Sequence, residues 1–398
     1  MKYDSRMKIN MTEKTSVEKT WKAYLNKIEP ADRTAMELAK KRWNSVAKPI
    51  GSLGILEEDI IKIAGIRGNA SGMKLDRSAL AVMCADHGVV AEGVSQTGKD
   101  VTRIVAENFT KGETSTSKMC RISGTDLYPV DMGMDCGPTG QKEPDMHRIL
   151  DRKVARGSGN IAREPAMSRT GCLQALLSGI DLAFRLKEKG YEILAAGEMG
   201  IGNTTPAAAM SAVLTGLSPE EATGRGAGLS DAGLEKKKKA VEMAVSRFYE
   251  KYPEYRNGTK EQYESGELSA VTVLAELGGF DLAGMTGLFL GGAAAKIPVL
   301  MDGFLSTVSG LLAVLIRKEA KDYMLASHIS TEPAGAAILQ MLDLPAPLHM
   351  GMHLGEGSGA VAMIPLLRMG AKVYEEMSTF SDISVEQYVD YQEKGEQP

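Results

Sequence analysis

Short apolar runs alternate with amphipathic helix patterns in this chain, and this alternation limits the folds it can adopt. Residues 78–84 form a continuous apolar run, and 127–132 and 191–196 are two further strand candidates. Such runs are typical of strands buried on both faces of a sheet. Between the first two runs, one predicted helix face is apolar: Val101, Ile104, Val105 and Phe109. Strands that alternate with helices predict βαβ units, a mostly parallel sheet and an α/β fold.

Both ends of the chain differ from this alternating middle. Residues 15–67 carry helical patterns, with Thr15 and Glu18 spaced as a capping box, and turn residues interrupt them at 48–54. The segment 246–266 is charged and rich in tyrosine, which suggests an inserted surface segment. Residues 382–398 are acidic, and we expect them to be peripheral.

Composition excludes several classes of protein. A net charge of −4 and a pI near 5.9 argue against nucleic acid as a partner. The four cysteines have no CxxC spacing, which favours reduced thiols and a cytoplasmic location. No apolar leader is visible in residues 1–19, and the apolar zone 282–316 is interrupted by Lys296 and Asp302. We therefore predict buried elements in that zone and no membrane association.

A lone carboxylate in a glycine-rich turn is the most suggestive local feature. Glu356 lies between Gly355 and Gly357, after Leu354 and just before an apolar stretch. Glycine permits positive φ and lets a ligand approach the main chain closely. A glutamate in such a turn is rarely needed by the fold, so we interpret Glu356 as a general base that faces a small ligand.

A second glycine-rich turn follows the 191–196 run and opens a helix. It contains Glu198, and either Thr204 or Thr205 can serve as N-cap with Pro206 at the first helical position. Glycines before a helix N-terminus form a natural anion site. The turn lacks the lysine of a Walker loop and the third glycine of the dinucleotide fingerprint.

Two weaker signals lie further along the chain. The loop 224–229 could form a second phosphate-side turn, and Lys237 would be one cation on the following helix. The run 236–239 is otherwise expected to be a solvated helix face.

No metal site is predicted, and no cofactor. His349 and His353 have the spacing of a zinc pair, but the glutamate of HExxH is missing and glycines surround them. Asp86 and His87 follow a strand without further ligands nearby, so Ser95 and His87 could instead line a pocket for a flat ligand. No Gly-x-Ser-x-Gly elbow supports a serine hydrolase.

Seven segments, in order along the chain, resemble the nicotinate-nucleotide–dimethylbenzimidazole phosphoribosyltransferase family. They cover about residues 48 to 380: Lys48-Pro49-Ile50-Gly51-Ser52-Leu53-Gly54, Ala85-Asp86-His87-Gly88-Val89 with Glu92-Gly93-Val94-Ser95, Gly157-Ser158-Gly159-Asn160 to Met167, Gly197-Glu198-Met199-Gly200-Ile201-Gly202-Asn203-Thr204-Thr205, Gly224-Arg225-Gly226-Ala227-Gly228-Leu229, Gly278-Gly279-Phe280-Asp281, and Leu354-Gly355-Glu356-Gly357-Ser358-Gly359-Ala360.

The resemblance implies an enzyme that transfers the 5-phosphoribosyl group of nicotinate mononucleotide to 5,6-dimethylbenzimidazole or a related base. Its products would be nicotinate and α-ribazole 5′-phosphate, used in assembly of the cobalamin nucleotide loop. It also implies a homodimer with a large Rossmann-like domain and a smaller helical domain built from both chain ends. We expect helices of the small domain in 1–70, the catalytic α/β domain in 71–325 and the segment with the catalytic glutamate loop in 326–398.

The same resemblance assigns roles to individual residues. Glu356 takes the position of the general base, Glu198 that of a carboxylate in the nucleotide pocket, and Ser95 a place beside the base pocket. Lys237 matches an active-site lysine, with a register uncertain by one. Substrate contacts are further implied for the remaining matched residues: Met199, Gly200, Ile201, Gly202, Asn203, Leu354, Gly355 and Gly357.

Two departures and two rival functions remain open. Residues 96–102 and 111–115 differ from the usual family pattern next to the base-binding region, which leaves the acceptor open. An NAD-dependent oxidoreductase is suggested only by the glycine-rich turns, and the incomplete fingerprint at Gly200 counts against it. A non-catalytic paralogue is the second rival, and the intact Glu198 and Glu356 count against that one.

Overall fold

One parallel sheet organises the structure, a computed structural model that describes residues 11–389. Its strands within that range run in the order β3-β2-β1-β4-β5-β6. Their bounds are β1 (Ser78–Ala85), β2 (Thr125–Gly133), β3 (Leu150–Asp151), β4 (Ile193–Met199), β5 (Val299–Met301) and β6 (Met324–Ala326). This is the order of a doubly wound sheet whose direction reverses between β1 and β4. The predicted α/β fold with a Rossmann-like parallel sheet is confirmed.

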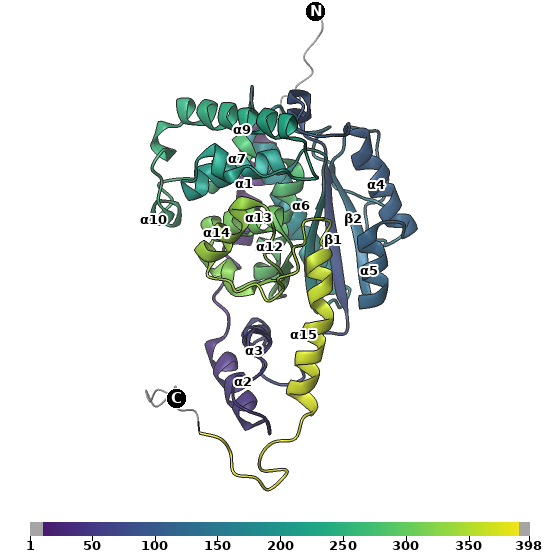
Figure 1. The fold of residues 1–398 in the computed structure, drawn as a ribbon, viewed down its shortest axis with the longest axis vertical. Coiled ribbons are helices and arrows are strands. Elements are labelled where there is room, and N and C mark those ends of the chain that lie inside the picture. The colour runs from purple at the N-terminus through teal and green to yellow at the C-terminus, as the bar shows by residue number, and fades with distance from the viewer. Residues whose placement is uncertain (1–10, 390–398) are drawn as a thin grey trace, which may run out of the picture.

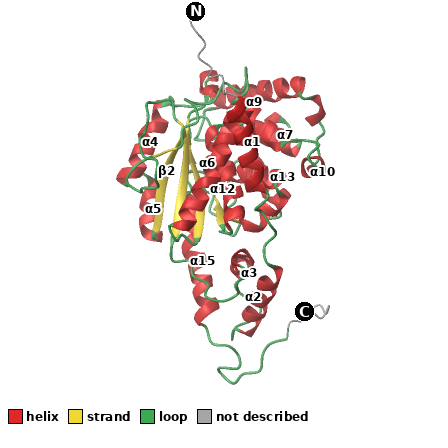
Figure 2. Cartoon of the chain, turned by 180° about the vertical axis from the view of Figure 1, so that it is seen from behind, coloured by secondary structure: helices red, strands yellow, loops and turns green. Residues whose placement is uncertain are grey.

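Helices cover both faces of the sheet. Figure 1 shows α4 and α5 beside β1 and β2, with α6, α12 and α13 on the other side, and Figure 2 shows the same layers from behind. The α-helices are α1 (Met11–Leu25), α2 (Arg33–Ser45), α3 (Ile55–Arg67), α4 (Asp100–Lys111), α5 (Ser115–Ser123), α6 (Arg169–Glu188), α7 (Thr204–Thr215), α8 (Pro219–Ala222), α9 (Asp231–Lys251), α10 (Lys260–Glu264), α11 (Ala270–Leu277), α12 (Phe280–Ala295), α13 (Phe304–Ile316), α14 (Pro333–Leu342) and α15 (Ser358–Glu376). Short 3₁₀ segments are η1 (Gly88–Glu92), η2 (Pro253–Tyr255) and η3 (Lys318–Tyr323).

Strand β1 separates two hydrophobic cores. All eight of its residues are buried. Ala79, Ala81 and Met83 belong to the core under α6 and α12, whereas the alternate residues of the strand belong to the core under α5 and α15. Because successive side chains of a strand point to opposite faces, a continuous apolar run is needed to satisfy both cores.

Helices α6 and α12 approach one another closely. A Cβ at Gly179 would overlap the carbonyl of Gly284, and a Cβ at Gly287 would overlap the carbonyl of Leu176. The small residues therefore allow two helix backbones to meet beneath the sheet. This contact keeps the support of the sheet thin and rigid.

Helix α15 connects the sheet to the helices of the N-terminal half. It packs against β4 and α5 along one part and against α3 along another, while α2 packs on α3. Val46 and Thr379 form an antiparallel bridge beyond the helix end. Helix α1 packs instead against α6 and α12. Helices from both halves of the chain thus pack together, and the domain boundaries at 70/71 and 325/326 stay predictions.

Two local predictions about helices are wrong. Thr15 lies inside α1, so Thr15 and Glu18 do not form a capping box. In α4, the buried residues are Thr102, Ala106 and Phe109, whereas Ile104 is 51% exposed. The predicted face is therefore only partly right, since Phe109 is buried and Val105 packs against the core while Ile104 faces solvent.

The segment 246–266 is not simply a surface insertion. Its other charged residues are exposed, but Arg247 is half-buried against Glu276, and Tyr255 and Tyr263 are buried. Their rings lie 6.0 Å apart between centroids, and Tyr255 packs against Phe248 at 5.1 Å. The tyrosines close the core beneath α9 by packing edge to face.

The apolar zone 282–316 forms α12, β5 and α13, which are buried in the core. Within residues 11–389, no helix combines the length and apolarity needed to cross a membrane. The four cysteines all have free thiols.

Candidate active site

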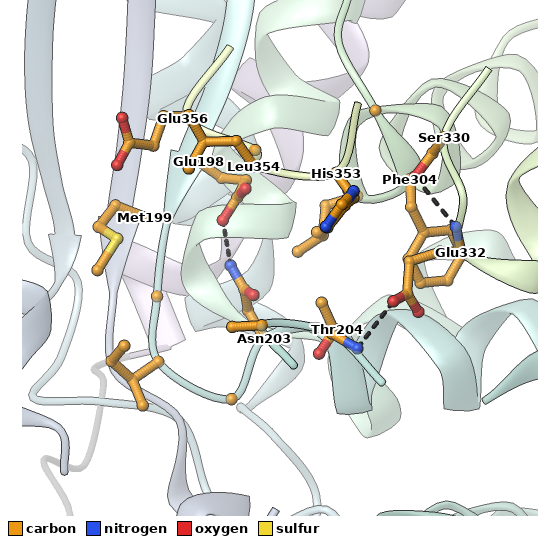
Figure 3. Close-up of a pocket in the computed structure, with 18 of the residues that line it drawn as sticks. Glu198, Met199, Asn203, Thr204, Phe304, Ser330, Glu332, His353, Leu354 and Glu356 are labelled. Atoms are coloured by element: carbon orange, nitrogen blue, oxygen red, sulfur yellow. Dashed lines mark hydrogen bonds between the residues drawn. The ribbon is translucent and has the colours of Figure 1, made fainter. Parts of the chain in front are cut away.

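A cavity of about 350 Å³ opens at the carboxyl ends of β4 and β5, beside the reversal point of the sheet. Ligands of open α/β sheets bind at this position. Figure 3 shows part of its lining. Ten predicted residues line it: Ser95, Glu198, Met199, Gly200, Ile201, Gly202, Asn203, Leu354, Gly355 and Glu356. The other two, Lys237 and Gly357, lie behind the lining and hydrogen-bond to residues that form it.

Glu356 lies in a turn whose backbone is left-handed at three successive residues. The φ angles are +82° at Gly355, +59° at Glu356 and +83° at Gly357. A Cβ at Gly355 would overlap Oε1 of Glu198, and one at Gly357 would overlap the side chain of Leu80. Both positions therefore require glycine. The left-handed conformation of Glu356 itself costs about 1–2 kcal/mol, a strain of the kind found at functional sites.

The Glu356 carboxyl group is suited to accept a proton. In Figure 3 it points to the side of the cavity where Met199 lies. Burial raises the pKa of Glu356, and Asp302 adds to the rise, whereas Thr116 at the start of α5 opposes it. Oε2 is buried and accepts no hydrogen bond from the described residues. A carboxylate with a raised pKa and a free acceptor oxygen is what general-base chemistry requires.

Asp302, just after β5, binds the same turn from beneath. Its Oδ2 accepts the Gly357 N–H at 3.1 Å, and its Oδ1 accepts those of Gly359 and Ala360 at 2.6 and 3.2 Å. These are N–H groups at the start of α15, where free donors and the helix dipole favour an anion. The side chain of Asp302 is only 4% exposed.

Glu198 takes part in a buried network of polar side chains. The amide Nδ2 of Asn203 donates to Oε2 of Glu198 and to Oδ2 of Asp281, the latter at 3.2 Å. Nε2 of His87 lies 3.1 Å from the same Oδ2. Burial raises the pKa of Glu198 to about 8, the Asn203 hydrogen bond opposes the rise, and Asp281 and Asp302 add to it. In the substrate-free protein, Glu198 is therefore mostly protonated at neutral pH.

Helix α7 begins with Thr204, and its N-cap residue is Asn203. The prediction of Thr204 or Thr205 as N-cap, with Pro206 at the first helical position, is wrong. The side chain of Asn203 bonds to the two carboxyl groups and does not cap the helix. Pro206 is tolerated at the third helical position because its missing N–H is one of those without an intrahelical partner. At this helix start the N–H groups of Asn203 and Thr205 donate to the carbonyls of Gly200 and Gly202, so the helix dipole rather than a set of free N–H groups favours an anion at the cavity.

Lys237 supplies a cation behind this helix N-terminus. Its Nζ donates to Oγ1 of Thr204 at 2.9 Å and to the Gly224 carbonyl at 2.8 Å. Burial lowers the pKa of Lys237 to about 8, and Glu332 opposes this shift. The expectation of a solvated lysine face holds for Lys236 and Lys239 but is wrong for Lys237, whose side chain is fully buried. Lys237 is the buried lysine of the run, and its assignment as the active-site lysine stays a prediction.

The loop 224–229 closes this end of the cavity. Arg225, Gly226 and Leu229 contribute to the lining. The Gly226 N–H donates to Oε1 of Glu332 at 2.8 Å, while Oε2 of Glu332 is buried and accepts no hydrogen bond from the part of the chain described. Because Glu332 occupies a backbone donor beside Lys237, it positions this loop in the substrate-free protein.

Sequence reasoning missed the residues that the C-terminal strands contribute. Asp302, Phe304, His328, Ser330 and Glu332 all line the cavity. The available signal was their position, since polar residues that follow parallel strands point to the ligand edge of a sheet. This positional signal could not be used, because β5 and β6 have only three residues each and such short strands leave no recognisable pattern.

The histidines do not form a metal site. His353 lines the cavity, and its Nδ1 contacts the Gly351 carbonyl at 3.0 Å, whereas His349 is exposed and neither lies on a helix. Among residues 11–389, no group of three or more His, Cys, Asp or Glu side chains could hold a metal ion. His87 does not line the cavity and instead supports it through Asp281.

Comparison with known proteins identifies the family. Residues 28–385 match the family described as Phosphoribosyltransferase. A nicotinate-nucleotide–dimethylbenzimidazole phosphoribosyltransferase of Ruminiclostridium cellulolyticum is 38% identical over 93% of this chain and 99% of its own length. The chain belongs to the nicotinate-nucleotide–dimethylbenzimidazole phosphoribosyltransferase family.

Further members of the family agree over the same range. The Escherichia coli enzyme of that name is 39% identical over 89% of this chain and 92% of its own length. The crystal structure of the Thermus thermophilus enzyme has a TM-score of 0.78 and 36% identity, and the match covers 90% of this chain and 100% of that one.

The departures from the family pattern lie at or near the cavity. Gln96 and Thr97 are part of its lining, and Nε2 of Gln96 donates to the Gly228 carbonyl at 2.5 Å. Residues 111–115 lead into α5, whose Thr116 lies beside Glu356. The first departure thus contributes to the cavity, whereas the second lies outside its lining and precedes the residue beside Glu356.

The raised pKa of Glu198 predicts a pH dependence of stability. Because the folded-state pKa rises from 4.5 to about 8, the folded protein holds a proton that the unfolded chain releases. The free energy of unfolding of the substrate-free protein should fall, relative to Glu198→Gln, as pH rises through this window, by at most about 1.4 kcal/mol per pH unit. Urea unfolding from pH 5 to 9 measures this difference, and parallel curves for the two proteins would contradict the assignment.

Proposed function

We propose that this protein transfers the 5-phosphoribosyl group of nicotinate mononucleotide to 5,6-dimethylbenzimidazole or a related lower-ligand base of cobalamin. The products are nicotinate and α-ribazole 5′-phosphate, with inversion at the anomeric carbon. The observation that carries this proposal is the placement of the Glu356 carboxylate in the same cavity as the α7 N-terminus. One end of the site accepts a proton and the other binds an anion.

Glu356 is the general base of this reaction. The unprotonated nitrogen of the azole attacks the ribose carbon, and the bond from that carbon to the pyridinium nitrogen breaks. Its electron pair remains on nicotinate, which neutralises the pyridinium. The proton on the other azole nitrogen passes to Glu356, whose raised pKa makes it a better acceptor than an exposed glutamate.

Glu198 binds the nucleotide on the electrophile side. It lies close to the turn that carries Glu356, since Oε1 approaches Gly355. Nicotinate mononucleotide carries a cationic ring, and an oxocarbenium-like transition state carries positive charge on the ribose. A nearby cation favours the ionised carboxylate and lowers the pKa of Glu198 on binding. Glu198 then stabilises charge at the reacting centre.

The phosphate binds at the N-terminus of α7. Gly200, Gly202 and Asn203 lead into that helix, and Lys237 lies behind Thr204. The dipole of α7 favours an anion there. Burial disfavours the charged form of Lys237 and lowers its pKa, and a bound phosphate favours the charged form again.

Product analysis tests the function directly. The protein is incubated with nicotinate mononucleotide and a panel of benzimidazoles, purines and phenols, and the products are identified by mass spectrometry. We expect nicotinate release coupled to a ribosylated benzimidazole phosphate. The absence of any ribosylated product from the whole panel would refute the proposal, and a preferred purine or phenol would change only the acceptor.

Glu356→Gln should lower kcat by roughly 100- to 10,000-fold, since it removes proton acceptance and little else. Binding of nicotinate mononucleotide, measured by calorimetry, should be largely retained. In the wild type, kcat/KM should fall with decreasing pH through a value above that of an ordinary glutamate, because the base must be unprotonated. Glu143→Gln, an exposed carboxylate that pairs with Arg185 outside the cavity lining, is the control. Near-wild-type nicotinate release by Glu356→Gln would rule out this base.

Lys237→Met should weaken binding of nicotinate mononucleotide about 10- to 100-fold, because it removes a buried positive charge behind the proposed phosphate site. The riboside, which lacks the phosphate, should bind both proteins equally. Lys239→Met is the matched control because Lys239 lies in the same run but is not buried. Equal losses for nucleotide and riboside would place the phosphate elsewhere.

We also propose that the enzyme is a cytoplasmic homodimer. Ile122 on α5 is 89% exposed and Ile104 on α4 is 51% exposed, which supports an apolar contact surface on this side of the molecule. Sedimentation at micromolar concentration should give twice the monomer mass. A single monomeric species would contradict the dimer.

A further inference from the structure

The N-terminus of α15 is held by a residue from a different part of the chain. Its N-cap residue is Gly357, which has no side chain to accept a hydrogen bond. Ser358 follows, but its Oγ is buried and has no hydrogen-bond partner among the described residues. The three bonds to Asp302 therefore take over a task that a local Ser, Thr, Asp or Asn performs in most helices.

This contact acts next to the strained residue. Glu356 precedes the three donors directly and has φ +59°. A non-glycine residue persists in this conformation only when its surroundings fix it. On the C-terminal side of Glu356, Asp302 fixes the Gly357 N–H, and on the N-terminal side Gly355 is packed against Glu198.

Asp302 is placed to act through the turn. Oδ1 already accepts two N–H groups and Oδ2 accepts one, so most of its acceptor capacity is occupied. His328 lies behind it, with Nδ1 3.9 Å from Oδ1. Capping a helix does not by itself require a buried carboxylate from a neighbouring strand, because burying a charge is costly.

We propose that Asp302 is a positioning residue that holds Glu356 in its reactive geometry by accepting the N–H groups of Gly357, Gly359 and Ala360. The inference depends on the proposed role of Glu356 as general base. Without Asp302, the turn relaxes from its left-handed conformation and the carboxyl group moves away from the acceptor nitrogen. A shift of about 1 Å at a reacting group can cost about 100-fold in rate.

Asp131 offers a matched control. It is also buried and follows the same architectural rule, since it lies near the end of β2 and accepts the Met134 N–H at 2.8 Å. It also accepts a hydrogen bond from Thr139 at 2.9 Å and pairs with Lys153. Asp131 is not part of the cavity lining. Asp131→Asn therefore disturbs a comparable buried contact without touching the Glu356 turn.

The first test compares steady-state kinetics of Asp302→Asn and Asp131→Asn. Asp302→Asn should lower kcat about 10- to 100-fold, while KM for nicotinate mononucleotide changes less than about threefold because ground-state binding does not use the base. Asp131→Asn should keep kcat within about threefold of the wild type. A kcat for Asp302→Asn equal to that of Asp131→Asn, or a loss confined to KM, would overturn the inference.

Amide hydrogen exchange supplies a readout that does not depend on turnover. In Asp302→Asn, exchange at residues 357–360 should accelerate, whereas Glu356→Gln should leave it unchanged. Asp302→Glu keeps an anionic acceptor and should recover part of kcat and of the protection. If Asp302→Asn does not fold, Asp302→Glu is compared with the wild type: kcat and the protection of residues 357–360 should fall together, and a loss of protection without a loss of kcat would refute the role.

A double-mutant cycle separates this inference from the function on which it depends. Adding Asp302→Asn to Glu356→Gln should change the residual kcat by less than about twofold, because residues that act as one unit are not additive. Full additivity would refute positioning while leaving Glu356 as the base. Wild-type turnover of Glu356→Gln alone would instead refute the proposed function.

Discussion

Three backbone N–H groups converge on the buried carboxylate of Asp302, and the geometry of the pocket depends on this contact. Each hydrogen bond to a charged group is worth about 1.5–3 kcal/mol, which offsets the cost of burying the charge. The contact joins the end of β5 to the start of α15. Since α15 also packs on β4, the contact sets the position of Glu356 relative to the strand that carries Glu198.

The cavity has an electrostatic gradient that suits a ligand with a cationic ring at one end and an anionic phosphate at the other. Burial raises the pKa values of Glu198 and Glu356 at one end and lowers that of Lys237 at the other. In each case desolvation is the main cause of the pKa shift, so these side chains are closer to neutral in the protein than they would be in water. A ligand with positive charge near the carboxyl groups and negative charge near α7 relieves this penalty at both ends.

The sequence predicted the sheet and most of the pocket, because both depend on local signals. A strand buried on both faces must be apolar throughout, as residues 78–84 are, and glycine-rich turns after strands mark the ligand edge. Asp302 escaped prediction because a three-residue strand leaves no periodicity and an isolated aspartate shows no partner. The N-cap of α7 was misplaced because the side chain of Asn203 is engaged by two carboxyl groups. Glu198 lies across the turn, and Asp281 is distant in sequence. The exposed Ile104 shows the same limit, because a periodic pattern does not say which side of a helix the protein covers.

The position of α15 has a consequence for how the enzyme is made. The strands β1, β2 and β4 and the end of the pocket proposed to bind the anion are synthesised before α15. Helix α3 packs against α15, and α2 packs on α3, so these two helices complete their packing only after α15 has been made. Contacts between residues so far apart in sequence close large loops and form late. In the proposed mechanism, a chain shortened before Glu356 lacks the general base, whatever part of the pocket it forms. Activity appears only when the two halves of the chain have met.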